Sequence, residues 1–304
     1  MTNKGGRPRS TADSAAARRA AAQRSVAAAR GRQTPDRRRL LIVIVPVIVV
    51  LAVVATLVAV KVGSAKHTVQ PAQQSQLASA AVVSEVTSVP TATFNAVGAG
   101  SIATAPKAIQ GPELTAGGKP RLLYVGAEFC PYCAAERWAL VAALARFGTF
   151  SSLGQTFSSP TDVYPNTATL SFHGSTYTSG VLSFTGAELQ SNQQVGGQYT
   201  PLDSLDPADM QLFQSLGGNS YPFVDIAGRY VITGASYNPA ILQGKTQAQI
   251  AATLSDPRSP IAAAVDGTAN VITAALCSVT ANQPTPVCTS PGVVAARAKL
   301  TSGG

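Results

Sequence analysis

Histidine and cysteine are scarce in this chain: its 304 residues include two histidines and four cysteines. The histidines are His67 and His173, and one pair of cysteines has the spacing Cys-x-x-Cys. A zinc site built on such a pair usually needs a second pair or two histidines. A serine triad would depend on His173, and the sequence contains no Gly-x-Ser-x-Gly elbow. We therefore expect neither a zinc site nor a serine hydrolase, and no bound cofactor.

Positive charge is distributed unevenly along the sequence. Residues 1–39 hold 11 of the 23 Lys and Arg residues and 2 of the 14 acidic ones, which leaves 12 of each sign after Arg39. Because the remainder is nearly neutral, no nucleic-acid partner is expected. The first 39 residues also lack aromatic side chains, which predicts a disordered tail. Its charges are interpreted as a topology signal, with contact to anionic membrane lipid as the alternative.

An uncharged run of 21 residues occupies positions 40–60, between Arg39 and Lys61. Its length and its Leu, Ile, Val and Ala content predict a transmembrane helix. A cleaved signal peptide, with Gly63 and Ala65 at the cleavage site, is the alternative, but its apolar region usually has roughly 7–15 residues. The positive charge before the helix predicts a cell-membrane protein with a single pass, a cytoplasmic N-terminal tail and an extracytoplasmic C-terminal domain.

Composition divides the rest of the chain into three parts. Residues 61–105 are rich in Gln, Ser, Ala and Thr, which predicts a stalk with a short helix between Leu77 and Val86. Apolar density rises after Ala105, and residues 106–290 are expected to form one extracytoplasmic domain. Residues 291–304 are expected to be a flexible C-terminal tail.

Strands and helices are predicted to alternate in this domain, which indicates an α/β architecture. The apolar run at 121–127 is typical of a strand buried on both faces. A helix is expected next, over 133–147, with Gly148 after its end. Further strands are expected at 153–158, 168–173, 181–184, 223–226 and 230–234, and further helices at 207–216, 246–254 and 260–277.

Cys130 and Cys133 lie where the first strand meets the first helix. At a helix start, free amide groups and the helix dipole stabilise a thiolate on the first cysteine, which makes it a nucleophile. The second cysteine follows about one turn later and can resolve a mixed disulfide. A structural disulfide is the alternative, but it gives no reason for the pair to open a helix. We predict a redox-active Cys130–Cys133 disulfide, and a structural disulfide between Cys277 and Cys288.

Tyr221 and Pro222 stand immediately before the strand predicted at 223–226. A proline in this position can simply begin a strand. Because it follows a Cys-x-x-Cys in the chain, we expect instead a cis-proline like that of the thioredoxin superfamily, which presents a backbone edge to a substrate chain. Pro222 is then a site residue. The expected supporting residues of the site are Tyr221, Pro131 and Tyr132.

The segments 124–140, 161–167 and 221–226 together resemble the domain of unknown function 929 family, within the thioredoxin superfamily. The resemblance extends over about residues 76–288 and brings no established substrate. It implies a thioredoxin-like α/β fold that is often membrane-anchored. The chain after Cys133 is longer than in a minimal thioredoxin, so we expect an inserted hairpin at 161–184 and an extra C-terminal helix.

Two departures from thioredoxin concern the chemistry. Thioredoxin has a buried acid six residues before its first cysteine, where this chain has Tyr124. Glu128 and Glu136 are candidates for handling the proton instead, although either can be an ordinary solvated charge. No histidine lies between Cys130 and Cys133, which argues against a strongly oxidising pair and leaves reductase, isomerase and moderate oxidase open.

These features predict a membrane-tethered thiol-disulfide oxidoreductase that acts on protein thiols and disulfides outside the cytoplasm. Cys130 is expected to attack and Cys133 to resolve, and a membrane redox partner that the sequence does not identify would recharge the pair. A non-enzymatic adaptor protein with the same fold is the main alternative. A thiol peroxidase is a second alternative, but no Thr or Arg arrangement tied to Cys130 favours it.

Overall fold

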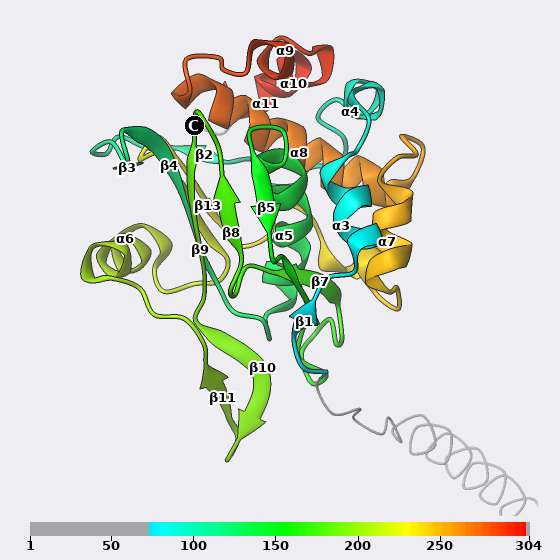
Figure 1. Cartoon of the computed structure of the whole chain (residues 1–304), viewed down its shortest axis with the longest axis vertical. Helices are drawn as coiled ribbons and strands as arrows, with labels where there is room; N and C mark the ends of the chain where they lie inside the picture. The colour runs from blue at the N-terminus through cyan, green and yellow to red at the C-terminus, as the bar shows by residue number, and fades with distance from the viewer. Residues whose placement is uncertain (1–72, 302–304) are drawn as a thin grey trace, which may run out of the picture. The chain divides into compact units, whose positions relative to one another are not determined.

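A sheet of six strands lies at the centre of the computed structural model, which describes residues 73–301 (Figure 1). The strand order is β2-β13-β12-β4-β3, and β9 also pairs with β4. The β4–β9 pair is parallel and the other pairs are antiparallel. The strands are β2 Lys107–Ala108, β3 Thr115–Ala116, β4 Lys119–Gly126, β9 Ser183–Glu188, β12 Phe223–Ile226 and β13 Tyr230–Thr233.

Helices cover both faces of this sheet, so the chain is a mixed α/β protein, as predicted. α5 and α8 pack against each other on one face, and α6 lies on the other (Figure 1). The helices are α3 Ala80–Thr87, α4 Thr91–Val97, α5 Pro131–Leu144, α6 Pro207–Gly217, the 3-10 helix η1 Pro239–Leu242, α7 Gln247–Thr253, α8 Pro260–Val279, α9 Thr285–Cys288, α10 Pro291–Ala296 and α11 Ala298–Thr301.

The predicted membrane segment lies outside the described residues, together with the basic tail at 1–39 and residues 61–72 of the predicted stalk. Within residues 73–301, one helix, α8, is long and apolar enough to cross a membrane. Most of its residues are buried inside the domain, where they pack against α5 and the sheet. Its apolar surface therefore forms the protein core.

β4 is buried on both faces, as the apolar run in the sequence predicted. Leu122 and Tyr124 face the main core with α5 and α8, whereas Leu123 and Val125 join a second cluster with Phe213 of α6. All four β4 side chains are fully buried. Because successive side chains of a strand point to opposite faces, this alternation places Tyr124 under the helix that carries the cysteines.

The prediction of an inserted hairpin at residues 161–184 is wrong. The three strands that fall in or across this region all pair with strands outside it: β7 with β6, β8 with β5, and β9 with β4. Long-range pairing thus replaces the expected local one. A separate hairpin, β10–β11, follows β9. These strands are β5 Thr149–Ser151, β6 Gly154–Phe157, β7 Ala168–Ser171, β8 Thr176–Thr178, β10 Gln190–Val195 and β11 Gln198–Pro201.

The domain begins earlier than the boundary predicted near Ala105. The short helix expected between Leu77 and Val86 is present as α3, but Val82 and Val86 are buried in the main core, and so is Phe94 of α4. A further strand, β1 (Gln76–Leu77), pairs with β6. Apolar residues spaced along α3 and α4 cover the sheet-facing helices, so this part of the chain belongs to the domain.

The flexible tail predicted at 291–304 is also incorrect over its described part. α10 and α11 follow residue 290, and Val293 and Ala296 are fully buried. A Cβ on Gly292 would lie 2.3 Å from the carbonyl oxygen of Phe94, so glycine permits the close approach of α10 to α4. The segment is short but it closes one side of the core.

The predicted disulfide between Cys277 and Cys288 is present and joins the end of α8 to α9. Replacing both cysteines with Ser should lower the free energy of unfolding by roughly 2–3 kcal/mol, because the crosslink limits the unfolded chain over a short loop. Thermal melting with and without a reducing agent checks this: reductant should destabilise the native protein and leave the double variant unaffected. An equal melting temperature in both proteins would contradict it.

Asp266 of α8 is fully buried, and within the described residues neither of its carboxylate oxygens has a hydrogen-bond partner. Burial raises the pKa of Asp266 to about 8, and the nearby Arg146 opposes the rise. A folded-state pKa above the unfolded one means that folding retains a proton that the unfolded chain loses. The stability penalty is absent below the unfolded pKa, near 4, and grows up to about pH 8.

Asp266→Asn should therefore raise the melting temperature at pH 8, by roughly a few degrees or more, and the gain should disappear towards pH 4. Melting curves across this pH range measure the difference between the variant and the native protein. Glu113→Gln, which removes a largely exposed carboxylate, is the control and should show no comparable pH-dependent gain. A gain for Asp266→Asn that is equal at both ends of the range would refute the assignment.

Candidate active site

The cysteine pair lies at the start of α5, immediately after β4. Cys130 is the N-cap residue, and its Sγ accepts a hydrogen bond from the backbone N–H of Cys133 at 3.2 Å. Pro131 occupies the first turn of the helix, where its missing N–H removes no intrahelical bond. The strand, cysteine pair and helix thus follow in the predicted order, with Cys130 at the helix N-terminus.

The two thiols differ in environment. The side chain of Cys130 keeps slight solvent exposure, 5%, whereas Cys133 is fully buried, and both are free thiols in the structure. Hydrogen bonds from Cys133 and the nearby Arg137 cation lower the pKa of Cys130, although burial opposes them. Burial, followed by the hydrogen bond and charge of Cys130, raises the pKa of Cys133 well above its ordinary value. Cys130 is therefore the thiol of the pair that ionises more readily.

Tyr221 and Pro222 lie on the segment that enters β12. The peptide bond between them is cis, as expected from the sequence. Tyr221 packs with Phe129 against a cluster formed by Ala127, Cys130 and Cys133. Pro222 is buried, and its carbonyl accepts a hydrogen bond from Gly234 at 2.9 Å. The structure thus brings this segment to the cysteines.

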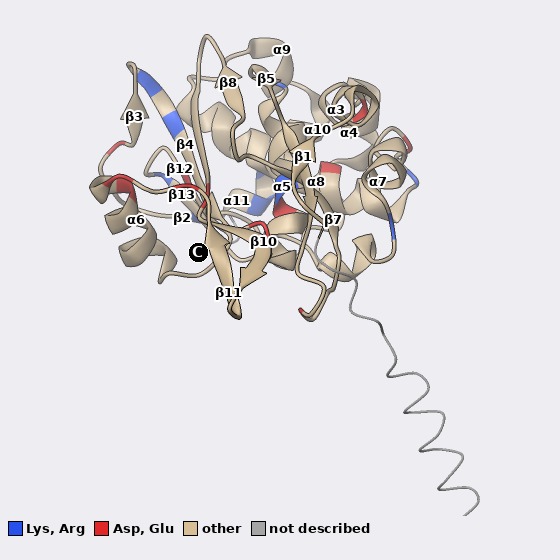
Figure 2. Ribbon diagram, turned by 60° about the horizontal axis from the view of Figure 1, so that its bottom comes forward, with Lys and Arg blue, Asp and Glu red and all other residues tan. Residues whose placement is uncertain are grey.

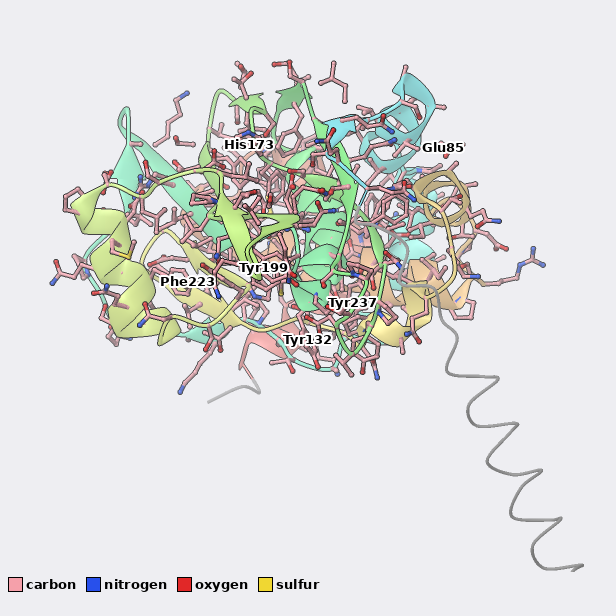
Figure 3. All side chains as sticks on the ribbon, turned by 90° about the horizontal axis from the view of Figure 1, so that it is seen from below. Glu85, Tyr132, His173, Tyr199, Phe223 and Tyr237 are labelled. Carbon is pink, nitrogen blue, oxygen red and sulfur yellow. A yellow bond between two sulfur atoms is a disulfide. The ribbon has the colours of Figure 1, made fainter. Side chains whose placement is uncertain are left out.

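Five aromatic side chains lie around the cysteine pair: Phe129, Tyr132, Tyr164, Tyr199 and Tyr221. We call them the aromatic group. Phe129 stacks on Tyr199 of β11 with ring centroids 4.1 Å apart and meets Tyr221 edge-on at 6.2 Å. Tyr132, between the two cysteines, is 40% exposed and lies edge-on to Tyr164 at 5.8 Å. Figure 3 views this end of the molecule and labels Tyr132 and Tyr199.

The β10–β11 hairpin extends from the domain next to the aromatic group (Figure 1). It is held to the cysteine loop by a hydrogen bond from the Glu128 N–H to the Gln190 carbonyl, 2.9 Å long. Residues 190–201 contain no Asp, Glu, Lys or Arg, and both strands are accordingly tan in Figure 2. Sequence reasoning missed the hairpin because its residues are polar and lack the apolar alternation of a half-buried strand.

Glu128 and Glu136, the two acids considered for proton transfer, are both buried rather than solvated. Glu128 accepts hydrogen bonds from the hydroxyls of Ser75 and Ser171. Glu136 accepts from the N–H and the hydroxyl of Ser236, at 2.8 and 3.0 Å. Burial raises the pKa of Glu136 to about 7, although both bonds from Ser236 oppose the rise. Each carboxylate is thus engaged by neighbouring hydroxyl or amide groups.

A buried ion pair between Arg137 and Glu188 lies beside the cysteines. Arg137 donates from Nε and Nη2 to the two carboxylate oxygens of Glu188, both at 2.7 Å, and from Nη2 to the Ala127 carbonyl at 2.7 Å. Both side chains are fully buried. Sequence reasoning missed this pair. One signal was available: Arg137 follows Cys133 by four residues, so the two share a face of α5.

Within the described residues, no three His, Cys, Asp or Glu side chains are grouped as metal ligands would be. His173, the last residue of the strand expected at 168–173, lies in the turn after β7 and pairs with Asp203 at 2.7 Å. Figure 3 labels it at the opposite edge of the view from Tyr132.

Comparison with known proteins gives one match. The family model described as "Domain of unknown function (DUF929)" matches residues 106–202 and 216–278, which include both Cys130–Cys133 and Tyr221–Pro222. No curated protein and no solved structure matches the chain. The matched region covers β4, α5, β12, β13 and most of α8, the elements that hold the candidate site.

The difference between the two thiols predicts selective alkylation of the reduced protein. At mildly acidic pH, iodoacetamide should modify Cys130 first, because a lowered pKa keeps part of this thiol ionised while Cys133 stays protonated and buried. Peptide mapping by mass spectrometry measures the order of labelling. The Cys130→Ser variant is the control and should lose the fast phase. Faster labelling of Cys133 would refute the assignment of the nucleophile.

Proposed function

Because the chain belongs to the domain of unknown function 929 family, whose description states no activity, we propose its function from the site: it is a membrane-tethered thiol-disulfide oxidoreductase. Its substrates are thiols and disulfides of proteins outside the cytoplasm. The observation that carries this proposal is the asymmetry of the cysteine pair, with a lowered pKa at Cys130 and a raised one at Cys133. This asymmetry assigns one thiol to attack and the other to resolution.

The reaction proceeds by two exchanges of sulfur partners. The Cys130 thiolate attacks one sulfur of a substrate disulfide, a new S–S bond forms, and the other substrate sulfur leaves as a thiolate that takes up a proton. Cys133 then loses its proton and attacks the Cys130 sulfur. The mixed disulfide breaks, the second substrate thiol is released, and the enzyme is left with a Cys130–Cys133 disulfide. The same steps in reverse oxidise a substrate dithiol.

We also assign a thioredoxin-like fold to this domain. Three features support the assignment: the order of β4, the cysteine pair and α5; the cis-proline before the antiparallel β12–β13 pair; and the packing of α8 beside α5. In this arrangement the segment at Tyr221 and Pro222 lies beside the cysteines, where an extended substrate chain can pair with its backbone. Pro222 shapes this edge, and Tyr132 and Tyr221 contact the substrate.

The membrane anchor completes the proposal. The apolar run at 40–60 supplies the span, and the basic residues before it place the tail in the cytoplasm, next to anionic lipid, and the domain outside. An extracytoplasmic location allows disulfides to persist, which suits both the Cys277–Cys288 bond and a disulfide-exchanging site. A membrane redox partner recharges Cys130 and Cys133 and sets the direction of exchange.

Insulin reduction by the full-length protein in detergent, with a thiol reductant, tests this function. The native protein should accelerate reduction and Cys130→Ser should abolish the acceleration, because the attacking thiol is absent. Cys133→Ala should accumulate mixed disulfides on Cys130 that persist until reductant removes them, because the resolving thiol is absent. The double variant Cys277→Ser, Cys288→Ser is the control: it loses two sulfurs outside the site and should retain activity. Equal rates with native protein and Cys130→Ser would instead indicate a non-enzymatic binding protein.

A further inference from the structure

Two buried polar atoms near Cys133 lack a hydrogen-bond partner within the described residues: Oη of Tyr124 and Nη1 of Arg137. Tyr124 and Arg137 are both fully buried. A buried donor without a partner costs roughly 1–3 kcal/mol, and more when it is charged. Protein interiors rarely hold such groups without a reason, which makes two of them at one place informative.

Backbone geometry brings the Tyr124 hydroxyl to the end of β4, under the cysteine loop. A Cβ on Gly126 would lie 2.1 Å from Oη of Tyr124, so the hydroxyl occupies the space that any other residue at position 126 would fill. Gly126 is the last residue of β4, and Ala127 beyond it packs directly against Cys130 and Cys133. The glycine therefore permits the phenol to extend towards the cysteine pair.

Arg137 approaches from the other side, on α5. It follows Cys133 by four residues, so both lie on one face of the helix, and its guanidinium carbon lies 6.0 Å from the Tyr124 ring centroid. The Nε and Nη2 edge of the guanidinium is bound to Glu188 and the Ala127 carbonyl. Nη1 is on the opposite edge and remains available.

Cys133 needs such donors when it reacts. As a thiol it is tolerated in its buried position, but as a thiolate it carries a charge that burial strongly disfavours. The amide N–H of Cys133 is directed to Cys130 and stabilises the first thiolate instead. Donors that are unpaired in the resting state and paired in the reacting state favour the reacting state selectively.

We propose that the Tyr124 hydroxyl, with Nη1 of Arg137 beside it, donates a hydrogen bond to the Cys133 thiolate during resolution of the mixed disulfide. This inference rests on the proposed function and identifies Tyr124 as a further catalytic residue. Both acids first considered for proton handling, Glu128 and Glu136, are engaged by hydroxyl and amide groups.

The charged and titratable groups around Cys133 agree with this role. They are Tyr124 on β4, Cys130 at the N-cap of α5, Arg137 on α5, Glu188 on β9 and Tyr221 before β12. Burial, and to a smaller degree the cysteine charges, raises the pKa of Tyr124 well above its ordinary value, so its hydroxyl keeps the proton that it donates. Arg137 favours the Cys133 thiolate, whereas Glu188 opposes it. A neutral donor beside this ion pair adds stabilisation without a further charge.

The resolving step exchanges one S–S bond for another and needs no further oxidant or reductant. The Cys133 thiolate attacks the Cys130 sulfur, the bond between Cys130 and the substrate sulfur breaks, and the Cys130–Cys133 bond forms. The electron pair leaves on the substrate thiolate, which takes up the equivalent of the proton that Cys133 lost. Tyr124 keeps its proton throughout and contributes a hydrogen bond alone.

Tyr124→Phe tests the proposal because it removes one oxygen that has no partner in the folded protein. The full-length reduced protein is mixed with dithiobis(nitrobenzoate), which releases one coloured thiolate when Cys130 attacks and a second when Cys133 resolves. The variant should keep the first phase, slow the second about tenfold at pH 7, and raise the midpoint of its pH profile by about one unit. Its melting temperature should not fall, since the lost hydroxyl makes no hydrogen bond.

Tyr237→Phe is the matched control. Tyr237 is also buried, but its hydroxyl donates to the Ala135 carbonyl of α5 at 2.6 Å, so this variant should lose stability and retain the native second phase. A native rate and midpoint for the second phase in Tyr124→Phe would overturn the proposal while leaving the proposed function intact. Absence of the first phase in the native protein would instead refute the proposed function.

Discussion

The buried ion pair between Arg137 and Glu188 connects the three segments on which the candidate site depends. Arg137 lies on α5, Glu188 ends β9, and the third acceptor, the Ala127 carbonyl, belongs to the loop that carries Cys130. Removing two charges from water is costly, and leaving one of them unpaired in the core would cost about 3–5 kcal/mol. The pair therefore holds the helix, the strand and the cysteine loop in one relative position, because few other arrangements satisfy both charges.

This constraint also shapes the electrostatics of the two thiols. Cys130 at the helix start receives the N–H of Cys133 and benefits from the Arg137 cation, whereas Cys133 lies deeper, where burial and the Glu188 carboxylate disfavour its thiolate. The two sulfurs are three residues apart in sequence and differ mainly in burial. The lowered pKa of Cys130 and the raised pKa of Cys133 thus have a common structural origin. Cys130 caps the N-terminus of α5, whereas Cys133 is buried near the Arg137–Glu188 ion pair.

The side chains that pack around the thiols are aromatic, and the neighbouring β10–β11 hairpin is polar and uncharged. Tyr199 of β11 stacks on Phe129 and so joins the aromatic group to this hairpin, which Figure 1 shows extending from the domain. Such a surface offers stacking contacts and backbone hydrogen bonds, which tolerate many polypeptide sequences, and few charge contacts, which would select among them. This suits the proposed exchange of disulfides with extended protein segments.

The sequence by itself determined the features that depend on neighbouring residues: the buried strand β4, the helix opened by Cys130 and Cys133, the residues before β12, and the Cys277–Cys288 pair. It did not determine which distant segments meet. The β5–β8 and β6–β7 pairings, the packing of α3, α4 and α10 on the core, and the contacts of Arg137 with Glu188 and of Tyr199 with Phe129 join residues far apart in the chain. Local periodicity shows which side chains must be buried, but it does not show which residues they pack against. Tertiary packing makes that choice, because a buried charge or hydroxyl acquires its role from the partner that the fold places beside it.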